Sequence, residues 1–205
     1  MRWGFAGQTK GVFMWNSINA FEIGILDFIQ GTFKCAFLDV FMPFITMFGE
    51  DGIFFIALAV VMLFFKKTRR TGLMIGAALL MGFIVGNLTL KPILARMRPY
   101  DFNEAFDKAT LLVHSLGDKS FPSGHTLAAF EACVVLFLTQ KKQVGIPALV
   151  LCVTIALSRL YLYVHYPTDV IAGALLGTLF AFLGVKLVDL AYAKFEAKKA
   201  SKVTA

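Results

Sequence analysis

The chain has 205 residues, of which 58% are hydrophobic and 16% are charged, and its formal net charge is +7. Soluble domains are usually about 45–50% apolar and about 25% charged. A chain this apolar cannot cover its surface with polar groups, so the composition excludes an ordinary soluble protein. It predicts an all-α, polytopic helix bundle in a membrane, and the lack of polar linkers predicts a single domain.

The first 50 residues have a weaker pattern than the rest. Residues 17–33 carry three polar side chains, Glu22, Asp27 and Gln30, at helical intervals among apolar residues. This amphipathic pattern is typical of a helix that lies in the membrane interface. Residues 37–48 are apolar but too short to cross a bilayer alone. We therefore expect an interfacial N-terminal segment on the outer face, with a sixth span as the alternative.

Five apolar stretches follow, each close to the roughly 17–25 residues that a transmembrane helix needs. They are residues 52–67, 71–91, 124–139, 145–164 and 168–191. Together they predict a transmembrane core over 51–193, which a basic tail at 194–205 follows.

The basic residues are unevenly shared among the connections. The turn after the first predicted span, the turn after the third and the C-terminal tail hold ten Lys and Arg residues against one acid, Glu196. The loop at 95–122 has four basic and four acidic residues, and the turn at 165–168 has no Lys or Arg. The positive-inside rule therefore predicts a multi-pass protein of the cell membrane with a cytoplasmic C-terminus and two outward-facing connections. The net charge of +7 then reflects topology and does not indicate a nucleic-acid site.

A first polar cluster lies at the outward end of the second predicted span. Lys91 and Arg98 are seven residues apart, about two helical turns, so they could face the same way. Pro92 and Pro99 make a regular helix through this segment doubtful. Taken alone, the pair also fits side chains that reach from a membrane helix to lipid headgroups.

A second cluster, Ser120–Thr126, opens the third predicted span. Ser123 suits a helix N-cap, and the free backbone N–H groups that follow would form an anion site. Gly124 would let a ligand approach the backbone, and His125 would lie within reach of it. The alternative is an ordinary capped helix start with a histidine nearby.

A third cluster spans the turn between the last two predicted spans. Arg159 lies near the end of one span, and Asp169 lies four residues after His165. Asp169 could accept a hydrogen bond from one ring nitrogen of His165 and so fix the tautomer of the other. Such an arrangement is typical of an oriented nucleophile, although an interfacial ion pair beside a surface histidine would look similar.

Together the clusters read K-x6-R-P, P-S-G-H and S-R-x5-H-x3-D. In this order they resemble the signature of the type 2 phosphatidic acid phosphatase family, from Lys91 to Asp169. The resemblance implies a membrane lipid phosphatase whose partners are a lipid phosphate and the bilayer, with no cofactor and no metal. It further implies roles for eight residues: His165 as nucleophile, His125 as general acid and base, Asp169 as the group that orients His165, and Lys91, Arg98, Ser123, Gly124 and Arg159 as phosphate ligands.

The loop R-P-Y-D-F-N followed by S-F-P-S-G-H-T resembles that of bacterial undecaprenyl-diphosphate phosphatases. This resemblance makes undecaprenyl diphosphate the expected substrate, with conversion to undecaprenyl phosphate. Phosphatidylglycerol phosphate, phosphatidate and lipid A phosphates remain alternatives. A lipid transporter is a non-enzyme alternative, but it would more often place polar residues at the bilayer midplane in repeated halves.

Some polar residues lie outside these motifs. We expect His114 to be a solvated loop residue and Arg96 to lie at the membrane interface, with contact to a second phosphate as the alternative. Glu131 falls about two turns inside the third predicted span, where an ionisable residue is a candidate functional site or a neutral partner of Asn87. The three cysteines, Cys35, Cys133 and Cys152, are expected to be inert packing residues, without a metal or disulfide framework.

Overall fold

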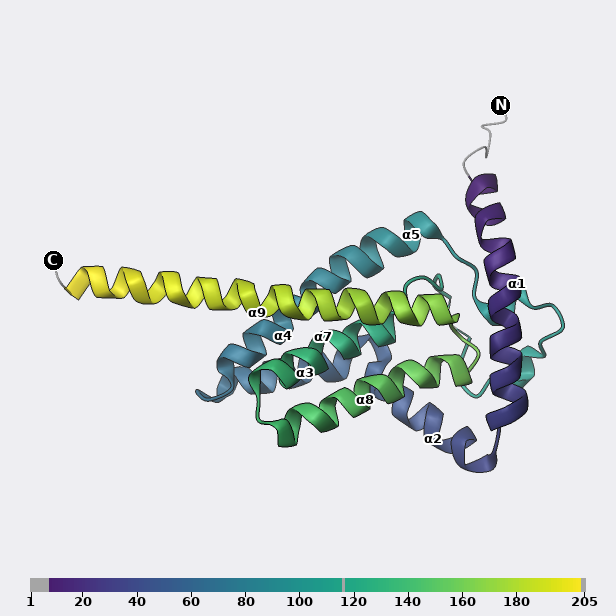
Figure 1. The fold of residues 1–205 in the computed structure, drawn as a ribbon, viewed down its shortest axis with the longest axis horizontal. Helices are drawn as coiled ribbons and strands as arrows, with labels where there is room; N and C mark the ends of the chain where they lie inside the picture. Colours follow the sequence, from purple (N-terminus) through teal and green to yellow (C-terminus); the bar gives the residue numbers. More distant parts are fainter. Residues whose placement is uncertain (1–7, 116, 204–205) are drawn as a thin grey trace.

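The computed structural model describes residues 8–115 and 117–203, and all regular elements in these ranges are helical. Figure 1 shows them as a bundle that a separate N-terminal helix crosses at one end. In chain order the elements are α1 (Gln8–Phe33), α2 (Ala36–Thr46), η1 (Met47–Gly52), α3 (Ile53–Phe64), α4 (Arg69–Gly82), η2 (Phe83–Leu90), α5 (Lys91–Leu94), α6 (Pro99–Phe102), η3 (Lys108–Thr110), α7 (Gly124–Thr139), α8 (Lys142–Tyr161) and α9 (Pro167–Val203).

Four helical runs in the described ranges are long and apolar enough to cross a membrane: Ala36–Phe64, Arg69–Phe102, Lys142–Tyr161 and Pro167–Ser201. The shorter apolar helix α7 lies among them. The predicted all-α membrane bundle is therefore confirmed.

The first span differs from the prediction of residues 52–67, because it begins at Ala36. Residues 37–48 are too short alone, but α2 continues through the 3₁₀ segment η1 into α3. Asp51 and Gly52 have positive φ angles of 47° and 67° in this segment, and they allow the chain to kink without ending the helical run.

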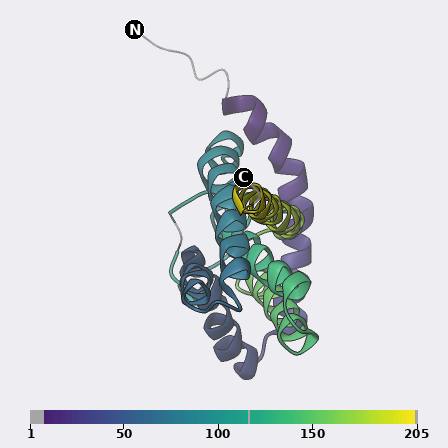
Figure 2. The same cartoon turned by 90° about the vertical axis from the view of Figure 1, so that its left-hand side faces the viewer.

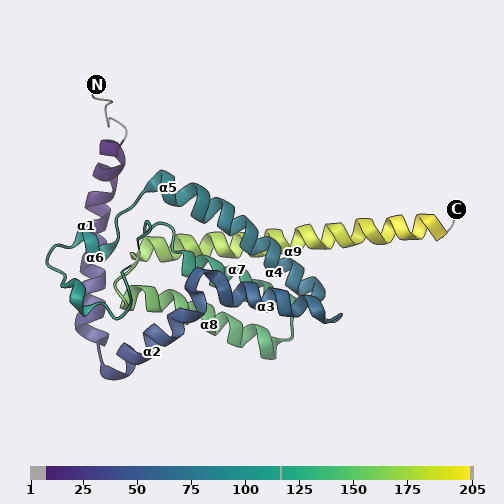
Figure 3. The same cartoon turned by 180° about the vertical axis from the view of Figure 1, so that it is seen from behind.

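α7 is the central helix of the bundle. α8 and α9 cover one side of it, and α3 and α4 cover the other (Figures 1 and 3). α9 approaches closely through Gly173 and Gly177, where an added Cβ would lie 2.8 Å from the carbonyl oxygen of Ser123 and 2.6 Å from that of Leu127. This small-xxx-small spacing lets two membrane helices pack backbone against backbone. The N-terminal end of α7 is thereby fixed against the start of α9.

α1 lies across the end of the bundle where α7 and α9 begin; Figure 2, which looks along α9, shows it behind the other helices. The predicted amphipathic helix is present, but it begins at Gln8 and its polar side faces the protein. Glu22 is 3% exposed, whereas Phe21 and Phe28 on the apolar side are 73% and 63% exposed. The apolar side is thus the one available to lipid.

The segment predicted as a C-terminal tail continues α9 as helix as far as Val203. In Figure 1 this end of α9 projects beyond the other helices, at the opposite end of the bundle from α1. The α3–α4 and α7–α8 connections, which carry the basic residues, lie toward the same end as the C-terminus.

Candidate active site

The start of α7 forms the floor of the site. Ser123 is its N-cap, as predicted, and its Oγ accepts hydrogen bonds from the N–H of Thr126 (3.5 Å) and from the Thr126 hydroxyl (3.0 Å). The backbone of Gly124, the next residue, is open to a ligand. A Cβ added there would have no neighbour closer than 3.6 Å, the distance to Nζ of Lys91. A helix N-terminus under a lysine ammonium is well suited to bind an anion.

His165 lies in the connection between α8 and α9 and is 1% exposed. Its Nε2 lies 3.3 Å from Nη1 of Arg98, and its Nδ1 lies 3.4 Å from Oδ2 of Asp169. A guanidinium can only donate, so Nε2 is the acceptor and the ring proton lies on Nδ1, toward Asp169. The contact that the sequence predicted between His165 and Asp169 is present, and it directs the lone pair of Nε2 toward the cations.

Burial lowers the pKa of His165 well below its usual 6.5, and the positive charges of Arg98, Arg159 and Lys91 lower it further. The imidazole is therefore neutral at neutral pH, and the lone pair of Nε2 accepts from Arg98. A neutral ring beside several cations is the state that a nucleophile for an anionic phosphoryl group requires.

Lys91 and Arg98 converge although the helix between them is interrupted. α5 ends at Leu94, Ala95 adopts a left-handed φ of 43°, and Arg98 is extended. Both side chains form an ion pair with the carboxylate of Asp118. Burial alone would raise the pKa of Asp118, but Arg98 and Lys91 lower it to about 2. The two cations therefore share one anionic group.

Arg159 is 2% exposed and reaches the site from the end of α8. One of its terminal nitrogens donates to the hydroxyl of Thr46, whereas its Nε is buried without a hydrogen-bond partner among the described residues. A buried guanidinium N–H without a partner is costly, and it is available to an incoming oxygen.

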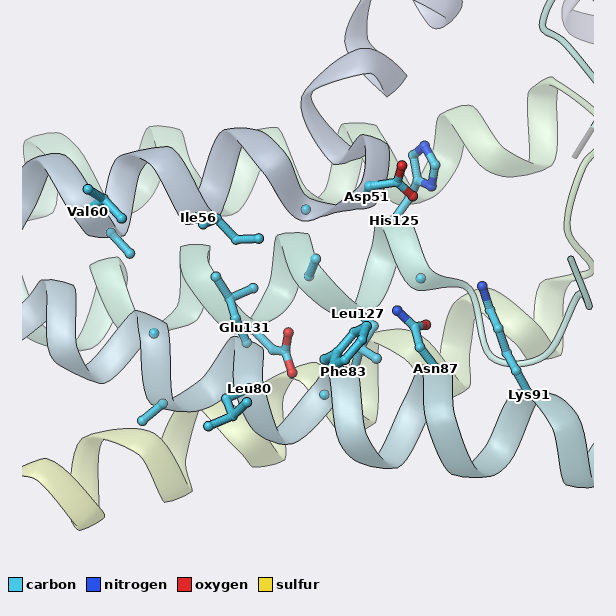
Figure 4. A pocket seen from close by; sticks show the side chains of 18 of the residues that line it. Asp51, Ile56, Val60, Leu80, Phe83, Asn87, Lys91, His125, Leu127 and Glu131 are labelled. Carbon is cyan, nitrogen blue, oxygen red and sulfur yellow. The ribbon is translucent and has the colours of Figure 1, made fainter.

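His125 stands where two cavities meet. The larger, about 820 Å³, runs from His125, His165 and Lys91 along α3, α4 and α7 (Figure 4). The smaller, about 560 Å³, is lined by His125 and Arg159 together with residues of α2, η1 and the loop 111–114. No hydrogen bond joins the His125 ring to another described residue, so the ring is free to exchange a proton with a ligand.

The inner part of the larger cavity is apolar except for Glu131, which is 1% exposed. Its Oε1 has no hydrogen-bond partner among the described residues, and so makes no bond to Asn87, which was one of the two alternatives. The carboxyl instead packs against Gly82, where an added Cβ would lie 1.9 Å from Oε1. The cavity thus joins a charged mouth to an apolar groove.

One prediction for a neighbouring residue was wrong. Arg96 does not lie at the membrane interface, because its side chain is 0% exposed and forms ion pairs with Glu22 and Asp169. Two short stretches of helix around a left-handed residue turn Arg96 inward and leave Arg98 at the cavity. His114 is exposed, as expected, although it also lines the smaller cavity.

Asp118 and Ser120 also belong to the site, and neither was assigned a role from the sequence. Asp118 pairs with the two cations, and the hydroxyl of Ser120 donates to Oδ2 of Asp169. Their signal was weak, because both lie in a loop without periodicity, although Ser120 lies two residues before the P-S-G-H motif.

Residues 70–192 match the PAP2 superfamily. The chain belongs to this superfamily. It is 34% identical over 154 residues to an undecaprenyl-diphosphatase of Sulfolobus acidocaldarius, which covers 75% of this chain and 72% of the relative.

Solved PAP2 structures have the same fold. A transmembrane PAP2 type phosphatidylglycerolphosphate phosphatase from Bacillus subtilis superposes with a TM-score of 0.69 at 30% identity, over 86% of this chain and 88% of its own. LpxE of Aquifex aeolicus superposes with a TM-score of 0.62 at 25% identity, over 80% and 93%. The protein is thus a PAP2 membrane lipid phosphatase.

Proposed function

We propose that this protein hydrolyses a phosphate from a membrane lipid through a phosphohistidine at His165. The observation that carries the proposal is the orientation of that ring, whose Nδ1 faces Asp169 and whose Nε2 faces Arg98. The lone pair of Nε2 therefore points at the cationic mouth of the larger cavity, where a phosphoryl group would bind.

In the first step, Nε2 of His165 attacks phosphorus in line, a P–N bond forms, and the bond to the leaving oxygen breaks. His125, protonated once the anionic phosphate is bound, gives this proton to the leaving oxygen as the lipid product departs. The imidazolium character that develops on His165 is stabilised by the Asp169 carboxylate. In the second step, His125 takes a proton from water, the water oxygen attacks phosphorus, and the P–N bond breaks to release inorganic phosphate.

Three cations neutralise the charge on the phosphoryl oxygens in this scheme. Lys91 and Arg98 lie over the start of α7, and Arg159 offers its unpartnered Nε from the other side. The Ser123 cap and the N–H of Gly124 add donors at the helix terminus. Phosphoryl transfer depends mainly on positioning and charge neutralisation. These groups supply both, so we propose that the reaction needs no metal ion.

The apolar groove supports a lipid as the substrate. It continues from the mouth between α3 and α4, where Ile56, Val60 and Leu80 line it (Figure 4). A phosphate at the mouth would leave a hydrocarbon chain to occupy the groove, and burial of that chain contributes roughly 25 cal/mol per Å² of apolar surface.

Undecaprenyl diphosphate is the proposed substrate, with undecaprenyl phosphate as the product. The resemblance of the loop before His125 supports it, and so does the name of the relative from Sulfolobus acidocaldarius. Phosphatidylglycerol phosphate, phosphatidate and lipid A phosphates are the alternatives. A phosphatidylglycerolphosphate phosphatase has a similar structure, and a lipid A 4'-phosphatase of Bacteroides thetaiotaomicron is 32% identical over 49% of this chain.

For the membrane orientation, we propose that the mouth faces outward and that the C-terminus is cytoplasmic. The support is the charge asymmetry, because the connections at the end opposite the site carry the basic residues. We also propose that the chain is one phosphatase domain, since α7 packs against helices from both halves of the core.

The decisive test is phosphate release by the purified protein in detergent, with EDTA present. Undecaprenyl diphosphate, phosphatidylglycerol phosphate, phosphatidate and lipid A would be compared side by side. His165→Ala is the matched variant, and we expect it to lose activity by at least about 10³-fold while its thermal unfolding changes little. A denaturing quench at alkaline pH, where the P–N bond of phosphohistidine survives, should trap phosphoenzyme with the wild type and none with the variant.

Release that survives EDTA and disappears in His165→Ala would support the mechanism, and the lipid with the highest kcat/KM would identify the substrate. Equal activity of the variant would overturn the role of His165. Loss of activity with EDTA that Mg²⁺ restores would overturn metal independence but leave the nucleophile in place.

A further inference from the structure

Arg96 lies in a buried network next to the site, and the reaction as proposed assigns it no part. Its guanidinium is stacked between two rings, 4.4 Å from the centroid of Trp15 and 3.9 Å from that of Tyr166. Its Nε donates to Oδ1 of Asn19 at 2.9 Å, and Nη1 donates to the hydroxyl of Thr168 at 2.7 Å. The side chain is therefore held in one orientation by two aromatic rings and by hydrogen bonds along its edge.

Two buried carboxylates share this guanidinium. Nη1 donates to Asp169 at 2.5 Å, and Nη2 donates to Glu22, which belongs to α1. Glu22 is itself fixed, because it accepts hydrogen bonds from the backbone N–H of Thr168 at 2.7 Å and from the Thr168 hydroxyl at 2.9 Å. A continuous chain of contacts thus runs from α1 through Arg96 to Asp169 and on to His165.

Asp169 depends on this cation. It is 0% exposed, and a buried carboxylate without an opposite charge tends to bind a proton instead. Its other partners are the hydroxyl of Ser120, the N–H of Tyr166 and the ring of His165. None of these carries a positive charge while His165 is neutral. Arg96 is the cation that contacts the carboxylate among the described residues.

We propose that Arg96 and Glu22 are positioning residues for His165: Arg96 keeps Asp169 ionised and in place, and Glu22 of α1 holds Arg96. The N-terminal helix is then part of the catalytic apparatus without touching the substrate. The inference rests on the proposed role of His165 as nucleophile.

Arg96 is positive and Glu22 is negative, so substituting each of them should shift the pH dependence of the reaction in opposite directions. Asp169 faces Arg96, Glu22 and His165. The charged or titratable groups around His165 are Lys91, Arg98, Asp118, His125 and Arg159. None of these is changed by substituting Arg96 or Glu22, so a change in pH dependence would come from the network itself.

The experiment is the pH profile of kcat/KM for wild type, Arg96→Gln and Glu22→Gln, with the same lipid substrate. If activity requires ionised Asp169, loss of the positive charge of Arg96 should move the acid limb of the kcat/KM profile to higher pH by about 1–3 units. The Gln of Glu22→Gln can still accept a hydrogen bond from Arg96, so loss of the negative charge should move the acid limb to lower pH, by less. For Arg96→Gln, kcat should fall by roughly 10- to 100-fold while KM changes little.

Arg96→Lys is the conservative variant, and it should restore the wild-type position of the limb although not the full kcat, because an ammonium cannot bridge both carboxylates in one plane. Arg70→Gln is the control, since Arg70 forms an exposed ion pair with Asp189 away from the site. It should leave the profile unchanged.

A second measurement does not depend on turnover. The chain has three histidines, His114, His125 and His165, so their ring ¹⁵N resonances can be assigned by substitution. Arg98 and Asp169 both favour the proton on Nδ1 of His165 in the wild type, and with Asp169 released in Arg96→Gln a second tautomer, protonated on Nε2, should become detectable.

Opposite shifts of the acid limb, with the loss of the single tautomer, would support the proposal. Shifts in the same direction, or an unchanged limb and tautomer in Arg96→Gln, would overturn it and leave the proposed function intact. If His165→Ala were as active as the wild type, the proposed function would fail instead, and the tautomer measurement would still decide whether Arg96 orients His165.

Discussion

The two ends of α7 are built in different ways. At its start, Ser123 and Gly124 lie among ion pairs and hydrogen bonds, and His125 is partly exposed between two cavities. Further along, Ala132 and Val135 are 0% exposed and pack in the main apolar core. The first end is held by polar contacts between segments far apart in the sequence, and the second by close packing of small and apolar residues.

This difference separates chemistry from stability within one helix. Polar groups at the first end gain little net free energy on folding, because each gave up hydrogen bonds to water. Apolar burial and close packing at the second end provide most of the stability. Variants at the start of α7 should therefore change the reaction with little effect on unfolding, and variants along its length should do the reverse.

His125→Gln should give the largest effect of the variants that probe this contrast. We expect kcat to fall by about 10²–10⁴-fold with a lipid substrate, because the leaving oxygen loses its proton donor. The loss should be smaller with p-nitrophenyl phosphate, whose leaving group needs no proton. Rapid-quench measurements should show that phosphoenzyme accumulates, since its hydrolysis is also slowed. Equal losses with both substrates would contradict a general acid role.

Gly177→Ala should lower the stability of the protein and have little effect on the reaction. Its Cβ would lie 2.6 Å from the carbonyl oxygen of Leu127 and 2.8 Å from Cβ of Phe130, so α9 must move away from α7. We expect a loss of about 1–3 kcal/mol in the free energy of unfolding, measured by thermal or denaturant unfolding in detergent. The control is Gly24→Ala on α1, where no atom lies within 4 Å of the added Cβ. Equal stability of the two variants would contradict close packing here.

Asp118→Asn should have the smallest effect and act on binding alone. The carboxylate competes with a phosphoryl group for Lys91 and Arg98, and its side chain is 48% exposed. We expect KM to fall by roughly 2- to 5-fold with kcat unchanged. Because the pKa of Asp118 is about 2, the carboxylate is ionised throughout pH 5–8, and the effect should not vary with pH in that range.

The control for this variant is Asp101→Asn, whose carboxylate pairs with Lys108 on the surface. It should leave KM unchanged. A rise in KM for Asp118→Asn would mean that Asp118 helps to bind the substrate.

The sequence was sufficient for the features that depend on local patterns. Apolar runs predicted the spans, and short motifs predicted the N-cap at Ser123 and the contact of His165 with Asp169, because these partners are near in the chain. The start of the first span was missed because two short helices join across a kink that has no periodic signal.

The contacts of Arg96 could not be predicted from local sequence patterns. Glu22 and Arg96 are 74 residues apart, and nothing in their local patterns pairs them. The polar residues of α1 did carry a signal, but a helix with one polar side can turn that side to water or to buried partners. Only the tertiary structure decides between the two.

The meeting of the two cavities at His125 gives the site two openings with different surroundings. One continues into an apolar groove, and the other is bordered by the exposed loop residue His114. A reaction that divides one amphipathic molecule produces a fragment that dissolves in hydrocarbon and a fragment that dissolves in water. Two exits would let these fragments leave without passing one another, so the departure of the ion would not wait for the slow lateral diffusion of the lipid.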